Sequence, residues 1–289
     1  MDVGVVGVGI MGGAMTSNLL RAGHRVVAFD VDTARTSDLT DEGLVVAQSA
    51  AGVAASVSVV ILSLPSPSAL HQVADELVES GITGVLCLET GTLPLADKIL
   101  ARDRLAAVGI EMMDVPLSGT GLQARDATLV VLASGSAEGF ERAEPVFDAI
   151  GRSRHYLGEF GNGSKMKYIA NLLVAVHNLA TAEAHALGIA AGMDPAVVQE
   201  VMEDGVGSSK IFQIRGPMMV ADEYPPAARL DIILKDAGLI AGYARSVGAP
   251  TPLLDTALVV YEEASAAGLG GFDAAVLCRY LEQQGGLSR

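Results

Sequence analysis

Two lysines stand two positions apart at the start of an apolar stretch, in the segment GNGSKMKYIAN at residues 161–171. Residues four apart on a helix share a face, so Lys167 and Asn171 would point into the same space, with Lys165 about 200° away. A lysine that faces an apolar cleft loses hydration, which lowers its pKa and lets it exchange a proton near neutral pH. From these residues alone, two solvated lysines at the start of a helix are the simpler alternative.

A glycine-rich segment near the N-terminus offers a different chemistry. The sequence VGVVGVGIMGG places Gly7, Gly9 and Gly12 in G-x-G-x-x-G register between a predicted strand and a predicted helix. These glycines permit a tight turn, a close approach of the backbone to a pyrophosphate, and close packing of the helix against the strand. A glycine-rich turn in an ordinary α/β protein is the alternative, because the motif alone is weak. We predict a dinucleotide-binding loop that includes Ile10 and Met11.

Asp30 ends the second predicted strand, at the distance from Gly12 that the dinucleotide fingerprint requires. A carboxylate there accepts hydrogen bonds from both adenosine ribose hydroxyls and repels a 2′-phosphate, and neither Val31 nor Asp32 supplies a cation. NAD is therefore predicted as the cofactor, with NADP less favoured. The alternative is that Asp30 merely ends the strand, and Arg35 lies close enough in sequence to weaken the discrimination.

The first half of the chain alternates predicted strands with predicted helices, which are the elements that must position these residues. Short β-branched runs with helix-like segments between them are typical of a parallel, doubly wound sheet. The run VVILSL is apolar on both faces, as expected of a central strand that helices cover on both sides. The predicted strands are VGVVGVG, RVVAFD, VSVVILSL, GVLCLE, GIEMMDV and ATLVVLAS.

After about residue 160 the β-rich runs stop, and the spacing of apolar residues becomes helical. A second, all-helical domain is therefore predicted. The junction is placed between Gly158 and Gly163, which gives domains of residues 1–160 and 161–289. The predicted helices cover about 163–192, 195–204, 229–247, 251–267 and 272–284.

The 289 residues carry a net charge of −15, which disfavours nucleic acid and anionic membranes as partners. Cys87 and Cys278 lie in apolar segments without a metal-type spacing, so a reducing cytosol fits them best. The most apolar stretch, YIANLLVAVHNLATA, contains polar side chains and is predicted to be a buried helix, not a membrane span. With no secretion signal before the first strand, a cytoplasmic protein is expected.

Abundant Ala, Gly and Val suit close packing and leave apolar surface that a partner subunit could cover. A homodimer or homotetramer is therefore expected. His24 and His177 have no Ser, Cys or Asp partner in a recognisable order and are interpreted as structural. No metal-ligand cluster is present in the sequence pattern, and no metal is predicted.

Four stretches, spread in order from residue 7 to residue 239, resemble the β-hydroxyacid dehydrogenase family, the group of 3-hydroxyisobutyrate dehydrogenase and tartronate semialdehyde reductase. They are GVGIMGGAMTSNLLRAGH, DVPLSGTGLQARDATL, GNGSKMKYIANLL and LDIILKDAGL. The resemblance covers nearly the whole chain. It implies an N-terminal Rossmann-type doubly wound parallel sheet followed by an all-α C-terminal domain built on a long helix. It also implies a nicotinamide cofactor and a lysine as acid/base.

The resemblance decides between the two lysines. Aligning Gly161 and Gly163 with the family's glycines places Lys167, not Lys165, on the catalytic lysine. The same alignment places Asn171 on the asparagine four residues later. The helix geometry agrees with this choice, because Lys167 and Asn171 share a face.

The segment DVPLSGTGLQARDATL resembles the family's substrate-binding segment D-x-P-x-S-G-G, with Asp114, Ser118 and Gly119 matching. A serine hydroxyl and backbone N–H groups after a strand end can hold a small carboxylate, so Ser118, Gly119 and Thr120 are predicted to bind one. A loop that binds no ligand is the alternative. Thr120 replaces the family's second glycine, and Ala127 stands where a further glycine is usual, so the substrate need not be that of the named members.

Further positions on the cofactor side follow from the resemblance. Leu64 and Pro65, in LSLPSPSAL, match the family's cofactor-side loop, with an ordinary helix start as the alternative. Lys235 matches a lysine that reaches the cofactor and the active cleft, with a helix-surface charged pair as the alternative. Thr90 or Thr92, in LETGTLP, could contact the nicotinamide ribose; the sequence does not fix the register, and we assign Thr92 to the site.

Together these residues predict an oxidoreductase that transfers a hydride between NAD and a small β-hydroxy acid or the corresponding semialdehyde. Lys167 would take the hydroxyl proton, Asn171 would orient Lys167 and the hydroxyl, and Ser118 would hold the carboxylate. Ala228 stands where many members carry a phenylalanine, so a wider or differently closed pocket is expected. The alternatives are an NADPH-dependent imine reductase of the same superfamily and a non-catalytic NAD-binding protein.

Overall fold

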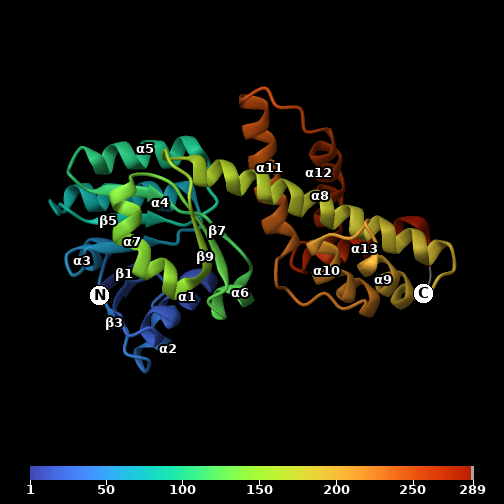
Figure 1. The fold of residues 1–289 in the computed structure, drawn as a ribbon, viewed down its shortest axis with the longest axis horizontal. Coiled ribbons are helices and arrows are strands. Elements are labelled where there is room, and N and C mark those ends of the chain that lie inside the picture. The colour runs from blue at the N-terminus through green and yellow to red at the C-terminus, as the bar shows by residue number, and fades with distance from the viewer. Residues whose placement is uncertain (288–289) are drawn as a thin grey trace. The chain divides into compact units, whose positions relative to one another are not determined.

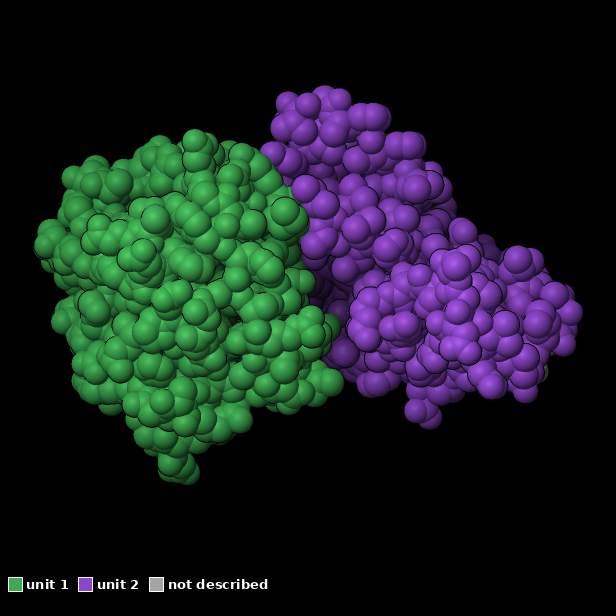
Figure 2. All heavy atoms as spheres, in the orientation of Figure 1, with its two compact units in different colours: residues 1–167 green, residues 168–289 purple. Residues whose placement is uncertain are grey.

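The chain forms two compact units, Met1–Lys167 and Tyr168–Arg289, and the computed structural model describes residues 1–287 (Figure 2). One long helix, α8 (Asn162–Ala190), begins in the first unit and continues into the second. The predicted boundary at residues 160/161 precedes this helix, whereas the boundary between the compact units falls inside it.

The first unit contains a six-stranded parallel sheet in the order β3-β2-β1-β4-β5-β6 (Figure 1). The order changes direction between β1 and β4, as in a Rossmann-type doubly wound sheet, so the predicted fold class is confirmed. The strands are β1 (Asp2–Val6), β2 (Arg25–Phe29), β3 (Val45–Val46), β4 (Val59–Leu62), β5 (Leu86–Glu89) and β6 (Glu111–Asp114). The helices between them are α1 (Ile10–Arg21), α2 (Ala34–Thr40), α3 (Ala50–Ala54), α4 (Pro67–Glu79) and α5 (Leu95–Ala106).

Side chains alternate along each strand, which gives the sheet two apolar faces. Val3 and Val5 of β1 pack with residues of α1 and of α7 (Ala137–Ile150), whereas Val6 packs with residues of α3, α4 and α5. In β4 the same alternation places Ile61 on the first face and Leu62 on the second. A strand that is buried on both faces has a continuous apolar sequence, which explains why the run VVILSL is recognisable.

The last predicted strand of the first half lies in a second, three-stranded sheet of order β7-β8-β9. This strand, β8 (Leu129–Ala133), pairs antiparallel with β7 (Leu117–Ser118) and parallel with β9 (Gly151–Tyr156). Ser134, the residue that follows β8, forms an isolated antiparallel bridge with Asp114 at the end of β6. The apolar pattern predicted the strand correctly, but it carries no information about which sheet the strand joins. The short helix α6 (Gly121–Arg125) connects β7 to β8.

The second unit is helical, as predicted, but it contains one helix that the sequence analysis missed. This helix, α10 (Lys210–Ala221), includes Gly216 and Pro217, which normally argue against a helix interior. A Cβ atom at position 216 would lie 1.8 Å from Oε1 of Gln199 in α9, so glycine permits the close approach of the two helices. The other helices are α9 (Pro195–Asp204), α11 (Leu230–Ser246), α12 (Pro252–Ala264), a π-helical turn (Ser265–Leu269), a 3₁₀ turn (Ala274–Val276) and α13 (Leu277–Gly285).

The core of the second unit contains buried polar residues that hold its helices together. Asn178 of α8 is fully buried and donates from Nδ2 to the hydroxyl of Tyr261 (2.8 Å) and to the carbonyl of Ala274 (2.9 Å). Arg215 and Asp273 form a buried ion pair with an Nε to Oδ1 distance of 3.2 Å. Asn178, on the same helix as Lys167 and Asn171, therefore serves packing.

By length and composition α8 alone, among the described residues, could cross a membrane, with a mean hydropathy of 1.3 in its most apolar window. Half of that window is buried within the structure. The core helix of a folded domain gives the same signal, which agrees with the predicted buried helix.

Candidate active site

Three loops lie close together at the carboxyl ends of β1, β4 and β5, where the strand order changes direction. In an open α/β sheet this is the place at which ligands bind. Gly7 has φ +91°, and a Cβ atom at position 12 would lie 1.9 Å from the carbonyl oxygen of Gly7. Only glycine fits at both positions, and α1 begins next to them with Ile10 and Met11 after Gly9. The open first turn of this helix fits the pyrophosphate of a dinucleotide.

Asp30 lies beside this loop, with its carboxylate held by the backbone. Its Oδ2 accepts from the N–H of Val8 (2.6 Å), and its Oδ1 accepts from the N–H of Asp32 (2.9 Å). Arg35 pairs with Asp30 at 3.8 Å and with Asp32 at 3.2 Å. Its guanidinium also lies 3.4 Å from where a Cβ atom at Gly9 would be. The carboxylate of Asp30 would repel a 2′-phosphate, whereas the neighbouring guanidinium of Arg35 would attract it.

The loops after β4 and β5 lie against each other and against the glycine loop. Leu64 contacts both neighbouring loops. Its carbonyl oxygen lies 3.2 Å from the position that a Cβ atom would take at Gly91, and its Cδ2 atom lies 3.6 Å from that position at Gly7. Pro65 follows and is exposed. The hydroxyl of Thr90 is buried and donates to the Leu62 carbonyl (2.9 Å), so it serves the strand ends. Thr92, which is half-buried, stays the predicted ribose contact.

The predicted carboxylate-binding residues follow β7 in the first unit. Ser118 is half-buried in β7, and Gly119 has φ +145° with Leu129 packed against it, a site where a side chain would collide. The N–H of Thr120 donates to Oε1 of Gln123 at 2.7 Å. A carboxylate could accept from Thr120 only by replacing that bond. The side chain of Gln123 is a neighbour of the site that sequence reasoning did not include.

The two lysines differ in exposure as helix geometry predicts. Lys167 is only 8% exposed, whereas Lys165 is exposed and its Nζ donates to Oδ1 of Asn162 at 3.0 Å. Asn171 follows Lys167 by one turn on the same helix and is half-buried. The catalytic roles of Lys167 and Asn171 stay predictions, but the buried lysine is the one that the family resemblance selects.

Asn171 and Lys235, both in the second unit, contact the same carboxylate. The amide of Asn171 donates from Nδ2 to Oδ2 of Asp236 (2.9 Å), and Nζ of Lys235 lies 3.2 Å from Oδ1 of Asp236. Asp236 is 9% exposed. From sequence Asp236 was recognised only as the charged neighbour of Lys235, because no local pattern reveals a bond between residues 65 positions apart.

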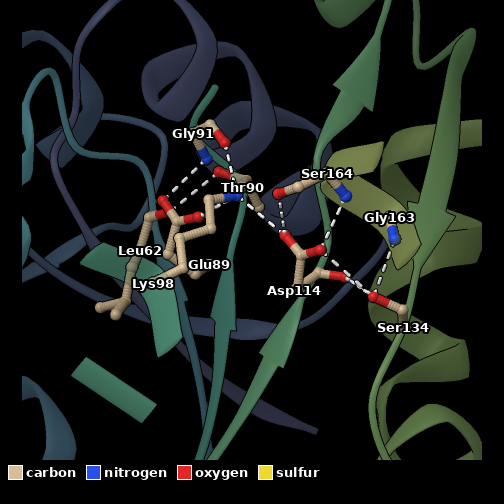
Figure 3. Close-up of polar contacts among 9 residues, drawn as sticks. All are labelled: Leu62, Glu89, Thr90, Gly91, Lys98, Asp114, Ser134, Gly163 and Ser164. Carbon is tan, nitrogen blue, oxygen red and sulfur yellow. Dashed lines mark hydrogen bonds and ion pairs between the residues drawn. The ribbon is translucent and has the colours of Figure 1, made fainter. Parts of the chain in front are cut away.

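A buried ion cluster in the first unit was not predicted. Lys98 of α5 is fully buried, and its Nζ lies 2.5 Å from Oε2 of Glu89 and 2.8 Å from Oδ1 of Asp114 (Figure 3). The same Nζ donates to the carbonyl of Gly91 at 2.7 Å. Glu89 and Asp114 are the last residues of β5 and β6, so the cluster lies at the carboxyl edge of the sheet. Nζ of Lys98 thus makes two hydrogen bonds, to Asp114 and to Gly91, and one ion pair, with Glu89.

The cluster raises the pKa of two of its members, Glu89 and Lys98, for different physical reasons. Burial raises the pKa of Glu89 above its ordinary value, and the attraction of Lys98 only partly opposes this. Burial alone would lower the pKa of Lys98, but the carboxylates of Glu89 and Asp114 outweigh it and raise the pKa. The sequence contained one signal of this arrangement. Lys98, Ala101 and Leu105 recur at positions i, i+3 and i+7, which places the lysine on the buried stripe of α5.

The cysteines and the histidines singled out from sequence take no part in these arrangements. Cys87 and Cys278 are buried and not joined in a disulfide, and burial raises the pKa of Cys87 to about 12. Nδ1 of His24 lies 3.2 Å from the N-terminal amino group. Within residues 1–287, no group of three or more His, Cys, Asp and Glu side chains could hold a metal ion.

Comparisons with known proteins agree with this geometry. Residues 2–158 match the model of the NAD binding domain of 6-phosphogluconate dehydrogenase. Residues 161–281 match the model described as NAD-binding of NADP-dependent 3-hydroxyisobutyrate dehydrogenase. Together the two models cover both units of the chain.

Relatives and a solved structure match over nearly the full length. An L-threonate dehydrogenase of Cupriavidus necator is 34% identical over 94% of this chain and 93% of its own. A 3-hydroxyisobutyrate dehydrogenase of Pseudomonas aeruginosa is 34% identical over 87% of this chain and 88% of its own. A crystal structure of 3-hydroxyisobutyrate dehydrogenase from Salmonella typhimurium matches with a TM-score of 0.87 and 32% identity, over 97% of this chain and 99% of that one.

These matches confirm the predicted enzyme class, an oxidoreductase with a nicotinamide cofactor, and support NAD as that cofactor. They also confirm the resemblance drawn from the four sequence stretches. The chain belongs to the β-hydroxyacid dehydrogenase family, the group of 3-hydroxyisobutyrate dehydrogenase.

Proposed function

We propose that this protein is an NAD-dependent dehydrogenase that interconverts a small β-hydroxy acid and the corresponding semialdehyde or ketone. The observation that carries the proposal is the exposure of the two lysines: Lys167 is buried on α8, and Lys165 is solvated. Desolvation of Lys167, on the helix face that it shares with Asn171, favours proton exchange, whereas Lys165 stays in contact with solvent.

The cofactor would be held by the glycine loop and by Asp30. The first turn of α1 would receive the pyrophosphate, and the carboxylate of Asp30 would accept from the adenosine ribose. When bound, NAD supplies the hydride acceptor for the carbinol carbon. Leu64, Pro65 and Thr92 are proposed to line the cofactor at the neighbouring strand ends.

The residues of the chain itself would move the proton and hold the substrate. Lys167, as the neutral amine, would take the hydroxyl proton during oxidation and return it from the ammonium during reduction. Because Asn171 donates from Nδ2 to Asp236, its amide group has a fixed orientation, and its Oδ1 would accept from Lys167 or from the substrate hydroxyl. Lys235, on the same carboxylate, would add positive charge.

The substrate carboxylate is proposed to bind at the loop after β7. The hydroxyl of Ser118 and the N–H of Gly119 would donate to it. Thr120 would join only after its N–H leaves Gln123. The branched side chain of Thr120, in place of glycine, adds a hydroxyl next to the carboxylate, which suits a substrate with further hydroxyl groups.

We further propose that the protein is a cytoplasmic homodimer or homotetramer that needs neither nucleic acid nor membrane. Met166, Ile169 and Leu173 of α8 are exposed at helical spacing, an apolar stripe that a second copy could cover. The net charge of −15 opposes binding to phosphate backbones and to anionic lipid. Sedimentation of the purified protein at micromolar concentration tests the oligomer, and a monomer would contradict it.

A substrate panel tests the enzymatic proposal. Purified protein with NAD is offered small hydroxy acids, including L-threonate, 3-hydroxyisobutyrate and L-serine, and NADH formation is followed by absorbance. Turnover of at least one acid is expected. Reduction of cyclic imines with NADPH and no oxidation of hydroxy acids would favour the imine reductase alternative. NAD binding without any turnover would favour a non-catalytic protein.

A further inference from the structure

We propose that Lys98 and Asp114 are positioning residues of the active site: through Ser164 they fix the first turn of α8 and thereby the location of Lys167. The inference rests on the proposed function, because it assigns a role relative to the acid/base lysine. All of the residues that carry it lie in the first unit.

Asp114 binds the N-terminal turn of α8 with both carboxylate oxygens. Its Oδ2 accepts from the N–H of Ser164 at 2.7 Å, and its Oδ1 accepts from the hydroxyl of Ser164 at 2.7 Å. The next N–H toward the helix start, that of Gly163, donates to the hydroxyl of Ser134 at 2.9 Å. Ser134 in turn donates toward Asp114 at 3.2 Å (Figure 3). Two N–H groups that a helix start leaves unpaired are thus satisfied by strand-end residues.

The start of α8 also lies in direct backbone contact with the sheets. A Cβ atom at position 163 would be 2.4 Å from the Leu132 carbonyl oxygen and 2.8 Å from the Asp114 carbonyl oxygen. Glycine is therefore required for this approach. Lys167 follows Ser164 by three residues, so a shift or rotation of the first turn would displace the lysine by a similar amount.

Lys98 fixes Asp114 in turn. Its Nζ bonds Oδ1 of Asp114, the same oxygen that accepts from the Ser164 hydroxyl. The ammonium of Lys98 donates to Asp114 and to the carbonyl of Gly91 and forms an ion pair with Glu89, so oxygens on three residues hold it in place. Lys98, Asp114 and Ser164 therefore form a continuous chain of hydrogen bonds from α5 to α8.

The same cluster fixes the loop that carries Thr92. The carbonyl of Gly91 accepts from Lys98 at 2.7 Å, and the N–H of Gly91 donates to Oε1 of Glu89 at 2.9 Å. One buried cluster thus holds the predicted ribose-contacting loop, the beginning of the predicted substrate segment and the first turn of the lysine-bearing helix.

General energetics favour a positioning role over a purely stabilising one. Removing two carboxylates and an ammonium from water is costly, and buried ion pairs can often be replaced by apolar residues without loss of stability. A buried cluster joined by hydrogen bonds and ion pairs nevertheless specifies one arrangement of the elements it joins. That property suits three segments that must hold a cofactor, a substrate and a proton-transfer group in fixed geometry.

The test compares two serines that each bond a helix start in the same unit. Ser164→Ala removes the hydroxyl bond to Asp114 and leaves the backbone bond intact. Ser136→Ala is the matched control, because Ser136 caps α7 by accepting from the N–H of Gly139 at 2.8 Å and touches none of the predicted site residues. Each full-length variant is assayed with NAD and a hydroxy acid that the wild type oxidises, after its folding is checked by circular dichroism.

Ser164→Ala should lower kcat by about 10-fold to 10²-fold, the effect of a small misplacement of a catalytic group, with NAD affinity unchanged. The apparent pKa of the kcat profile should shift, because the surroundings of Lys167 change. Ser164→Thr, which keeps the hydroxyl, should restore part of the lost kcat, and Ser136→Ala should match the wild type in kcat and in pH profile.

The outcomes separate this inference from the proposed function. A wild type that oxidises no hydroxy acid would overturn the proposed function and this inference with it. An active wild type whose Ser164→Ala variant behaves like Ser136→Ala would overturn the positioning role alone. If Ser164→Ala does not fold, Asp114→Asn replaces it in the comparison, and the same shift of the pH profile is expected.

Discussion

Two helices of the first unit begin at the edge of the sheets, and they use their N-terminal N–H groups in opposite ways. α1 begins after Gly9, which has no side chain to cap the helix. The first turn of α8 donates to Asp114 and to Ser134. Both helix starts carry a partial positive charge, so the open one suits an anionic ligand and the capped one is already satisfied by the protein. The start of α1 can therefore bind a ligand, whereas the start of α8 holds a side chain, Lys167, in position.

The largest effect on turnover is expected from a substitution on α8, the helix whose start is capped. Lys167→Ala should lower kcat by about 10² to 10⁴, the usual contribution of a positioned acid/base. NAD affinity should change little, because the glycine loop and the start of α1 are untouched. Lys165→Ala is the control and should leave turnover close to that of the wild type, since Lys165 is exposed and donates to Asn162. The reverse result would break the comparison, because α8 would then present the wrong lysine.

Substitutions of two adjacent glycines test the role of the open start of α1. Gly12→Ala places a Cβ atom 1.9 Å from the Gly7 carbonyl oxygen, which must push the loop away from the helix. Overpacking of about 1–3 kcal/mol corresponds to NAD binding weaker by about 10-fold to 10²-fold. Gly13→Ala is the control, because its Cβ would lie 3.5 Å from the nearest atom, an ordinary contact. Calorimetric titration with NAD measures both, and equal affinities would remove the argument for a steric requirement at Gly12.

The sequence predicted the open terminus better than the capped one, for a physical reason. The glycine loop, the strand before it and the helix after it are adjacent along the chain, so one short motif describes the whole site. The capped terminus draws on Asp114, Ser134 and Lys98, which come from separate elements. Spacing along the chain cannot show that such residues meet in the fold. Asp114 was recognised only through a family motif, and Lys98 was not recognised at all.

The same distinction explains the errors in the fold. Continuous apolar runs revealed each strand of the six-stranded sheet except β3, whose two residues are exposed. The sheet membership of β8 and the bond from Asn171 to Asp236 depend on contacts between distant segments. The helix α10 was missed because Gly216 and Pro217 are unfavourable locally, while packing against Gln199 compensates. Propensity failed there because tertiary contacts outweigh it.

A smaller effect is expected from the residue that selects the cofactor beside the open helix. Asp30→Asn removes the negative charge but keeps an oxygen to accept from Val8 or from Asp32. The ratio of kcat/KM for NAD to that for NADP should fall about tenfold, equivalent to about 1.4 kcal/mol, since Arg35 would then face a 2′-phosphate without competition. Asp32→Asn, at a half-exposed carboxylate that also pairs with Arg35, should change the ratio less. An unchanged ratio in Asp30→Asn would show that the start of α1 accepts either cofactor without help from this charge.

The smallest effect is expected from a substitution at the C-terminus of a helix, that of α6. Ala127 has φ +53° there, a left-handed conformation in which glycine is common. The N–H of Thr128 donates to the carbonyl of Gln123 at 2.9 Å, and that of Ala127 donates to Ala124 at 3.3 Å, so the backbone bonds of a glycine cap are present without the glycine.

Ala127→Gly should therefore raise the free energy of unfolding by about 0.5–1 kcal/mol, because relief of the left-handed strain exceeds the entropy that glycine adds to the unfolded chain. Asp222→Gly is the control, since Asp222 has φ +54° but its carboxylate accepts from Arg279 at 2.9 Å, and its removal should bring no gain. Urea unfolding of the two variants and the wild type measures the difference. Because the segment of Ala127 follows Ser118 and Thr120 in the predicted substrate loop, kcat measured on the same samples adds a second result. A stabilised Ala127→Gly variant with unchanged kcat would show that this terminus only ends a helix. A changed kcat would show that the conformation of this helix end affects turnover of the substrate.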